Sequence, residues 1–258
     1  MARLIWGVTE ATTLDAFLGG RLQIRQPRRG YRAGVDPVLL AASVAAKPGQ
    51  SVLELGCGVG VAILCLGRRV PGLALTGVEL QPDYAALAGH NAKANDLPLD
   101  VITADLRTLP ADLRQRRFDH VIMNPPYFDR EAGTAAADTG RDTALGGTTP
   151  LADWVDIGAR RLAPQGYLTL IQRVERFPET LAALQGRLGS IAVRPVAGRA
   201  DRAPGLFILR ARQEGRAPFR LLPTLIMHIG TAHVADKDSY TSQVAEVLRN
   251  GADLPMDR

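Results

Sequence analysis

The sequence predicts an α/β fold around a mainly parallel sheet, and three observations support this. Short apolar runs of strand-like composition alternate with helical stretches along most of the 258 residues. Hydrophobic residues make up 46% of the chain and charged residues 22%, a balance typical of a globular domain. No apolar run reaches the roughly 18 residues of a membrane-spanning helix, and the N-terminus lacks the apolar segment of a signal peptide. We therefore expect a globular, cytoplasmic protein with no membrane partner.

The expected elements follow this alternation in order. A turn and strand at 18–27 precede a helix at 36–46, with Asp36 as its N-cap and Pro37 in its first position. The next strands are expected at 50–56, 73–80, 99–105 and 118–124, with helices at 60–70 and 81–96. The second half is expected to form helices at 151–164, 177–188 and 240–250, strands at 166–172 and 219–229, and an antiparallel hairpin at 189–198 and 205–213.

The chain divides into two expected parts. Residues 1–34 form an N-terminal strand or hairpin extension, and residues 35–258 form the main domain. Within the main domain, residues 128–150 show no periodicity and are rich in Ala, Thr, Asp and Gly. Loops of this length in a compact domain are usually functional or disordered.

Three glycines stand between a buried strand and a helix in the stretch LELGCGVGV. Gly56, Gly58 and Gly60 allow the backbone to turn tightly and to approach a ligand closely. A dinucleotide site requires the pattern G-x-G-x-x-G, and this pattern fails because Val61 stands three residues after Gly58. The pattern present is E-x-G-x-G-x-G, which begins at Glu54.

Acidic residues end three consecutive strands: Glu54, Glu79 and Asp105. Each alone is equally well explained as a helix N-cap or a solvated loop acid. Together with the glycine turn, however, the ordered set favours a ligand site, because ligands of open α/β sheets bind at the carboxyl ends of the strands. A carboxylate at Glu79 has the position from which it can accept both hydroxyls of a ribose.

This region resembles the cofactor motif of class I S-adenosylmethionine methyltransferases. The resemblance implies a doubly wound, Rossmann-like sheet and S-adenosyl-L-methionine as cofactor. It also implies that the glycine turn packs against the methionine and ribose parts of the cofactor. In that family the residue at the position of Glu54 interacts around the methionine amine, and the residue at the position of Asp105 reads the adenine amine.

The tetrapeptide NPPY, Asn124 to Tyr127, follows the fourth strand of the main domain. Two prolines end a strand because neither donates to the ladder. Taken alone, the motif fits a proline-terminated edge strand with a surface tyrosine. In the methyltransferase resemblance it marks enzymes that methylate a planar nitrogen: the adenine N6, cytosine N4 or guanine N2 amine, or a glutamine amide. We expect Asn124 Oδ1 and the Pro125 carbonyl to accept the two amine hydrogens and Tyr127 to stack on the base.

Three further segments resemble the bacterial tRNA1(Val) adenine-37 N6-methyltransferase family: GYRAGVDPVLL before the glycine turn, FDHVIMNPPYF around the motif, and RLLPTLIMHIG with YTSQVAEVL near the C-terminus. The resemblance implies N6 methylation of an adenine in tRNA, and it places Asp36 beside the cofactor. A helix-capping role for Asp36 is an equal alternative. Other substrates remain open, namely a guanine N2 amine in rRNA or a protein glutamine amide, as do a pseudoenzyme that binds RNA without catalysis and a nicotinamide dehydrogenase.

The charge balance permits a nucleic-acid partner. The formal net charge is +5 and the pI about 9.6, and only three of the 31 basic residues are lysines. Arginine suits phosphate contacts, although a GC-rich genome explains the same bias. Candidate phosphate-binding clusters are Arg25, Arg28, Arg29 and Arg32, and Arg194, Arg199 and Arg202. With two cysteines and four histidines we expect no metal site, and we expect a monomer or weak dimer.

Overall fold

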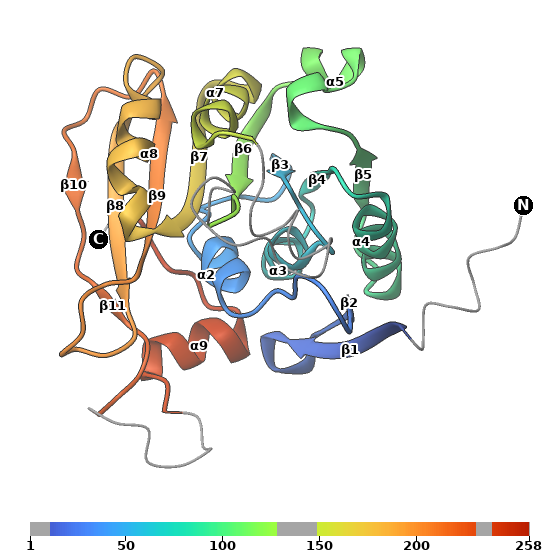
Figure 1. The fold of residues 1–258 in the computed structure, drawn as a ribbon, viewed down its shortest axis with the longest axis horizontal. Helices are drawn as coiled ribbons and strands as arrows, with labels where there is room; N and C mark the ends of the chain where they lie inside the picture. The colour runs from blue at the N-terminus through green and yellow to red at the C-terminus, as the bar shows by residue number, and fades with distance from the viewer. Residues whose placement is uncertain (1–10, 128–148, 231–238, 258) are drawn as a thin grey trace, which may run out of the picture.

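The computed structural model describes residues 11–127, 149–230 and 239–257. Within these ranges the chain forms a nine-stranded sheet, a separate two-stranded sheet and the helices that cover them (Figure 1). The loop expected at 128–150 lies outside the described residues except for its last two positions. In the described ranges, no helix has both the length and the apolar character needed to cross a membrane.

The central sheet is mostly parallel, as the sequence predicts. Its strands are β3 (Ser51–Leu55), β4 (Ala74–Glu79), β5 (Leu99–Thr103), β6 (Phe118–Met123), β7 (Leu162–Arg173), β8 (Leu188–Ala197), β9 (Leu206–Gln213), β10 (Arg220–Leu221) and β11 (Leu225–Ile226). The order across the sheet is β10-β8-β9-β7-β6-β3-β4-β5, with β11 also paired to β8. The five adjacent strands from β7 to β5 run parallel, and β9 runs antiparallel to both of its neighbours, β7 and β8.

The strand order reverses between β3 and β6. From β3 the chain builds one half of the sheet through β4 and β5, then returns to β6 beside β3 and builds the other half. Because β3 and β6 pair in parallel, their carboxyl ends lie side by side at this reversal, the switch point of the sheet. In open α/β sheets ligands bind at the carboxyl ends of the strands at such a point.

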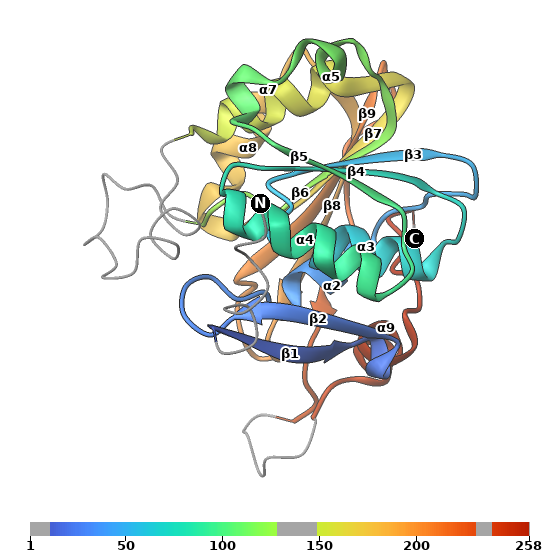
Figure 2. The same cartoon turned by 90° about the vertical axis from the view of Figure 1, so that its right-hand side faces the viewer.

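Helices cover both faces of the sheet (Figure 2). On one face lie α2 (Asp36–Ala42), α3 (Val61–Arg69) and α4 (Pro82–Ala94), and on the other lie α5 (Ala111–Gln115), α7 (Leu151–Arg161) and α8 (Phe177–Leu184). Two apolar clusters correspond to these layers. One joins α2, α3 and the N-terminal hairpin, and the other joins β6, β7, β9 and α7. The core is therefore divided by the sheet into two layers.

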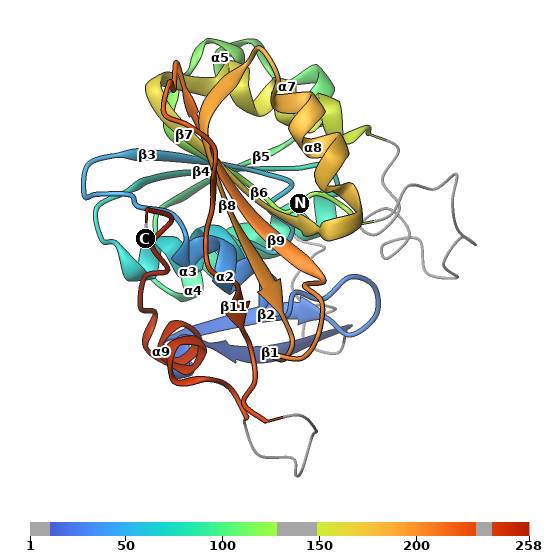
Figure 3. The ribbon, with the colours of Figure 1, turned by 90° about the vertical axis from the view of Figure 1, so that its left-hand side faces the viewer.

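The N-terminal hairpin forms a second sheet beneath α3 and α4. Strands β1 (Thr12–Phe17) and β2 (Leu22–Pro27) pair antiparallel and are joined by a 3₁₀ turn, η1 (Leu18–Gly20). Leu18, Leu22 and Ile24 are buried in the same apolar cluster as α2 and α3. The last helix, α9 (Ser242–Asn250), lies beside this turn (Figure 3). A Cβ at Gly19 would stand 2.6 Å from the carbonyl oxygen of Arg249, so the close approach of α9 requires glycine there.

Some expected boundaries were wrong. The helix expected to reach residue 46 ends at Ala42, and the helix expected to reach 188 ends at Leu184. The single strand expected at 219–229 is divided into β10 and β11, which pair with successive parts of β8. Pro223 stands between them and has no N–H to donate to a ladder, which explains the interruption. The short helix α5 was not expected from the sequence.

Candidate active site

The glycine turn between β3 and α3 has a left-handed backbone at Gly56, Gly58 and Gly60, with φ angles of 67°, 54° and 88°. The three glycines serve different needs. A Cβ at Gly56 would lie 2.6 Å from the ring of Trp154, so this glycine admits the helix α7. A Cβ at Gly60 would lie 3.2 Å from Leu64. At Gly58 no atom of the described residues lies within 4 Å of an added Cβ, so at this glycine the Cβ direction faces space that a ligand could occupy.

Glu54 and Glu79 bring two buried carboxylates to this turn. Glu54 is 3% exposed, and its Oε2 accepts a hydrogen bond from the Ile63 N–H in the first turn of α3 (3.0 Å). Glu79 is 6% exposed and accepts from the Gly58 N–H (2.9 Å) and the Gln81 N–H (2.9 Å). Burial raises the pKa of both carboxyls, and the charge of Glu79 raises the pKa of Glu54 further.

No arginine or lysine in the described ranges forms an ion pair with Glu54 or Glu79. Negative charge held in a desolvated place without a cation is unfavourable. The pair is therefore suited to a ligand that brings positive charge, and S-adenosylmethionine carries a sulfonium and an ammonium group. The backbone N–H bonds also fix the Glu79 carboxylate against the glycine turn and the Glu54 carboxylate against the start of α3.

Asp105 has a local role at the end of β5. It is the N-cap of the 3₁₀ turn η2 (Leu106–Thr108), where its side chain accepts from the Arg107 N–H (2.9 Å). Its carboxylate also forms an ion pair with the Arg107 guanidinium (2.7 Å), and this hydrogen bonding lowers the pKa of Asp105. Both carboxylate oxygens are thus in contact with Arg107. The expected contact with the cofactor adenine stays a prediction.

Asp36 links α2 to the NPPY motif. The N-cap prediction was wrong, because Val35 holds that position and no side chain caps the helix. Asp36 lies in the first turn, and its Oδ2 accepts a hydrogen bond from the Tyr127 hydroxyl (2.5 Å). Burial, and next the charge of Asp36, raise the pKa of Tyr127 well above its ordinary value. Burial and the charges of Asp36 and Glu54 also raise the pKa of Tyr31 to about 12.

Asn124 follows β6 directly, beside the carboxyl end of β3. Its Oδ1 is buried and has no hydrogen-bond partner among the described residues. A buried acceptor without a partner costs about 1–3 kcal/mol, so such an atom marks a place where a ligand donor is expected.

The backbone of the two prolines is held from the neighbouring strand. Gln172, fully buried at the end of β7, donates from Nε2 to the Pro125 carbonyl (3.2 Å) and the Pro126 carbonyl (3.4 Å). Arg176, in the 3₁₀ turn η4 (Val174–Arg176), donates to the Pro126 carbonyl (3.1 Å). Neither residue was singled out from the sequence. The sequence signal that could have identified Gln172 is a polar amide at the end of the apolar strand LTLIQ. In the structure the end of this strand lies beside the NPPY motif.

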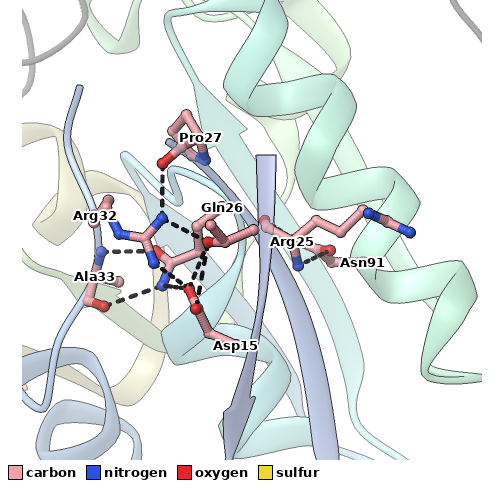
Figure 4. Close-up of polar contacts among 8 residues, drawn as sticks. Asp15, Arg25, Gln26, Pro27, Arg32, Ala33 and Asn91 are labelled. Atoms are coloured by element: carbon pink, nitrogen blue, oxygen red, sulfur yellow. Dashed lines mark hydrogen bonds and ion pairs between the residues drawn. The ribbon is translucent and has the colours of Figure 1, made fainter. Parts of the chain in front are cut away.

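Three of the seven arginines in the two candidate clusters form contacts within the protein. Arg32 pairs with Asp15 (2.6 Å) and donates to Thr13 and the Pro27 carbonyl, which ties residues 30–34 to the hairpin (Figure 4). Arg194, 6% exposed, donates to backbone carbonyls of Pro223 and Pro255, and Arg199 donates to those of Ile229 and Gly230. For Arg25, Arg28, Arg29 and Arg202, contact with phosphate stays a prediction.

A group of three or more His, Cys, Asp or Glu side chains arranged to hold a metal ion does not occur in the described ranges. The free thiols Cys57 and Cys65 are both buried. Burial raises the pKa of each thiol, and for Cys57, inside the glycine turn, the charges of Glu54 and Glu79 add to this. Both cysteines are therefore expected to be unreactive packing residues.

Comparison with known proteins agrees with this geometry. Residues 34–141 match the family model of the methyltransferase small domain. A tRNA1(Val) (adenine(37)-N6)-methyltransferase of Porphyromonas gingivalis is 30% identical over 233 residues, covering 85% of this chain and 90% of the relative. An enzyme of the same name from Dickeya chrysanthemi is 29% identical and covers 81% of this chain and 83% of the relative.

Solved structures share the fold. A predicted O-methyltransferase from Agrobacterium tumefaciens superposes with a TM-score of 0.70 at 24% identity and covers 86% of this chain and all of the other. A T. thermophilus 16S rRNA N2 methyltransferase in complex with AdoMet and guanosine superposes with a TM-score of 0.54 at 20% identity, covering 78% of this chain and 50% of the other. The fold is thus that of class I S-adenosylmethionine-dependent methyltransferases. With its match to the Porphyromonas relative over most of both sequences, the chain belongs to the tRNA1(Val) (adenine(37)-N6)-methyltransferase family, whose members use S-adenosylmethionine as methyl donor.

Proposed function

We propose that this protein transfers the methyl group of S-adenosylmethionine to the N6 amine of an adenine in tRNA, and that its substrate is adenine 37 of a valine tRNA, as in the names of its relatives. The observation that carries the proposal is the buried Asn124 Oδ1, which has no hydrogen-bond partner in the part of the chain that the structure describes and lies at the switch point of the sheet. The cytoplasm, where tRNA is modified, is the proposed location.

The cofactor half of the site consists of Gly58, Glu54 and Glu79. The open space at Gly58 admits a ligand against the backbone, and the two carboxylates supply negative charge for a cationic one. When bound, the cofactor supplies an electrophilic methyl group on a positively charged sulfur. We propose that Asp36 contributes through Tyr127 rather than as a direct cofactor ligand, because its Oδ2 is engaged by that hydroxyl.

The substrate half consists of Asn124, Pro125 and Tyr127. An exocyclic amine has two hydrogens, and Asn124 Oδ1 and the Pro125 carbonyl are two acceptors carried by adjacent residues. A carbonyl oxygen has two lone pairs, so the bond from Gln172 leaves the Pro125 carbonyl able to accept a second hydrogen. With both hydrogens held, the nitrogen lone pair is directed away from the base plane, which orients this weak nucleophile for in-line attack.

We propose that the ring of Tyr127 stacks on the adenine. Aromatic side chains commonly stack on unpaired or extruded bases in RNA. The bond from the Tyr127 hydroxyl to Asp36 fixes the ring before the base arrives, and this lowers the entropy lost on binding. No general base is assigned, because the amine proton becomes acidic once the methyl group has transferred.

The test is methyl transfer from labelled cofactor to separate fractions of total tRNA, rRNA and ribosomal protein, followed by nucleoside analysis. We expect N6-methyladenosine in the tRNA fraction only. A transcript of the valine tRNA with guanine in place of adenine 37 should accept no label. Label in protein alone, or N2-methylguanosine in rRNA, would contradict the proposal and favour one of the other planar amines.

A further inference from the structure

Two asparagine side chains one helical turn apart, Asn91 in α4 and Asn95 at its C-cap, hold strand β2. Asn95 Oδ1 accepts from the Gln23 N–H (2.9 Å) and its Nδ2 donates to the Gln23 carbonyl (2.8 Å). Asn91 Oδ1 accepts from the Arg25 N–H (2.8 Å) and its Nδ2 donates to the Arg25 carbonyl (3.0 Å). Each amide thus pairs with the free edge of β2 as a neighbouring strand would. Figure 4 shows the contact between Arg25 and Asn91.

The second hydrogen of each Nδ2 goes to a different place. In Asn95 it goes to the Asn91 carbonyl within the same helix (2.7 Å). In Asn91 it goes to the carbonyl of Val59 (3.0 Å), which lies in the glycine turn between Gly58 and Gly60. Asn91 is fully buried and Val59 is 5% exposed, so water has little access to replace this bond. Asn91 therefore contacts both the hairpin and the glycine turn.

The Val59 carbonyl belongs to the part of the turn that the cofactor site depends on. The Gly58 N–H is fixed by Glu79, and the Gly60 N–H donates to the Cys57 carbonyl (2.8 Å). The bond from Asn91 holds the carbonyl of the peptide unit between Val59 and Gly60, the same unit whose N–H donates to Cys57, and this unit follows Gly58 and its open space. Glycines flank Val59 on both sides, so the backbone around this unit is freer to change its orientation if the bond from Asn91 is lost.

We propose that Asn91 is a positioning residue of the cofactor site, which holds the glycine turn in its binding-ready shape by bracing it against the N-terminal hairpin. The hairpin is then part of the cofactor site, although it lies outside the sheet that carries the acidic residues. This inference concerns cofactor binding, so its test does not depend on which nucleotide is methylated.

The test compares Asn91→Ala with Asn95→Ala. Both variants lose the paired contact to β2, but only the first loses the contact to Val59. We expect Asn91→Ala to weaken S-adenosylmethionine binding, measured by calorimetry on the full chain, by about tenfold, the order expected when a buried carbonyl loses its partner. Asn95→Ala should change the affinity by less than about twofold, since it loses only the contacts to β2 and to its own helix.

A second measurement separates positioning from general loosening of the hairpin. Without cofactor, amide hydrogen exchange in residues 56–61 should be faster in Asn91→Ala than in Asn95→Ala, whereas residues 22–27 should exchange faster in both. If Asn91→Ala does not fold, Asn91→Ser and Asn95→Ser provide the same comparison with a smaller loss of volume. Equal losses of affinity in the two variants, or no loss in either, would overturn the proposal.

Discussion

On the β3–β4 side of the switch point the polar groups already have partners, whereas on the β6 side one of them has none. Glu54 accepts from the Ile63 N–H in the first turn of α3, and Glu79 accepts from the N–H groups of Gly58 in the glycine turn and Gln81 before α4. Asn124 Oδ1, by contrast, is buried without a hydrogen-bond partner among the described residues. In the proposed function, the protein alone builds the cofactor half, the complete side, and the methylated amine completes the substrate half, the incomplete side.

The largest expected effect is on the incomplete side. Asn124→Ala removes the unpartnered acceptor, so the amine loses one of the two groups that orient it. We expect kcat to fall by roughly 10²-fold or more, by analogy with the loss of one well-placed transition-state contact. Cofactor affinity should stay within about twofold, because no contact on the β3–β4 side changes.

Labelled-methyl kinetics and calorimetry on the same preparation check this prediction. Asn124→Ala should also unfold at an equal or higher temperature than the wild type, since a buried acceptor without a partner is removed. Unchanged turnover would exclude Asn124 from the mechanism. Its unpartnered oxygen would then no longer distinguish a substrate half on the β6 side from a cofactor half on the β3–β4 side.

On the complete side, the informative change is Glu54→Gln. The amide keeps an oxygen for the Ile63 N–H but removes the buried charge. We expect S-adenosylmethionine affinity to fall by about ten- to a hundredfold, the range for hydrogen bonds to charged groups. The stability of the cofactor-free protein should rise at neutral pH, because burial raises the pKa of Glu54 and so penalises its charged form.

The pH dependence follows from the same shift. Between the unfolded pKa of Glu54, ordinarily about 4.3, and its higher folded value, the folded chain binds more protons than the unfolded chain, so its contribution to stability falls as pH rises. Glu54→Gln should therefore be more stable than wild type above about pH 5, with the gap closing below pH 4. Thermal unfolding across this range measures the gap, and a gap that widens at low pH would contradict the assignment.

A smaller effect is expected from Gln172→Met, which keeps side-chain volume but cannot donate to the proline carbonyls. The Pro125 carbonyl then loses one of the contacts that fix its direction. We expect kcat to fall about tenfold with little change in the KM for cofactor, as for the loss of one buried neutral hydrogen bond.

Gln172→Glu is the matched control, because it keeps the shape and replaces a donor to these carbonyls with an acceptor. It should be at least as impaired as Gln172→Met at neutral pH. If both variants retain wild-type turnover, the hydrogen bonds from Gln172 to the Pro125 and Pro126 carbonyls do not contribute to catalysis.

The sequence predicted the parts of this site that are local in the chain. The glycine turn could be predicted because Gly56, Gly58 and Gly60, each with a positive φ, lie within five consecutive residues. The positions of Glu54, Glu79 and Asp105 at strand ends could be predicted from the locations of the strands alone. The end of the strand at the NPPY motif could be predicted in the same way, since two prolines end a strand whatever surrounds them.

What the sequence did not predict depends on pairs far apart in the chain. Asp36 was placed as a cap because aspartate before proline is a common helix start, but its partner, Tyr127, is 91 residues away. The roles of Gln172 and Asn91 depend on how β7 lies beside β6 and how α4 lies beside β2. No periodicity or propensity encodes these contacts, because they follow from tertiary packing.

The smallest expected effect comes from Tyr127→Phe. This variant tests whether Tyr127 acts by stacking of its ring or through its hydroxyl. The ring is kept, while the bond to Asp36 is lost. If the ring acts by stacking, activity should fall only about two- to tenfold, whereas Tyr127→Ala should lose much more. Burial and the charge of Asp36 hold the pKa of Tyr127 well above the assay range, so the hydroxyl stays protonated and the pH–rate profile of Tyr127→Phe should match that of wild type. A loss in Tyr127→Phe as large as in Asn124→Ala would instead assign the hydroxyl to the chemical step, beside the two acceptors at Asn124 and Pro125.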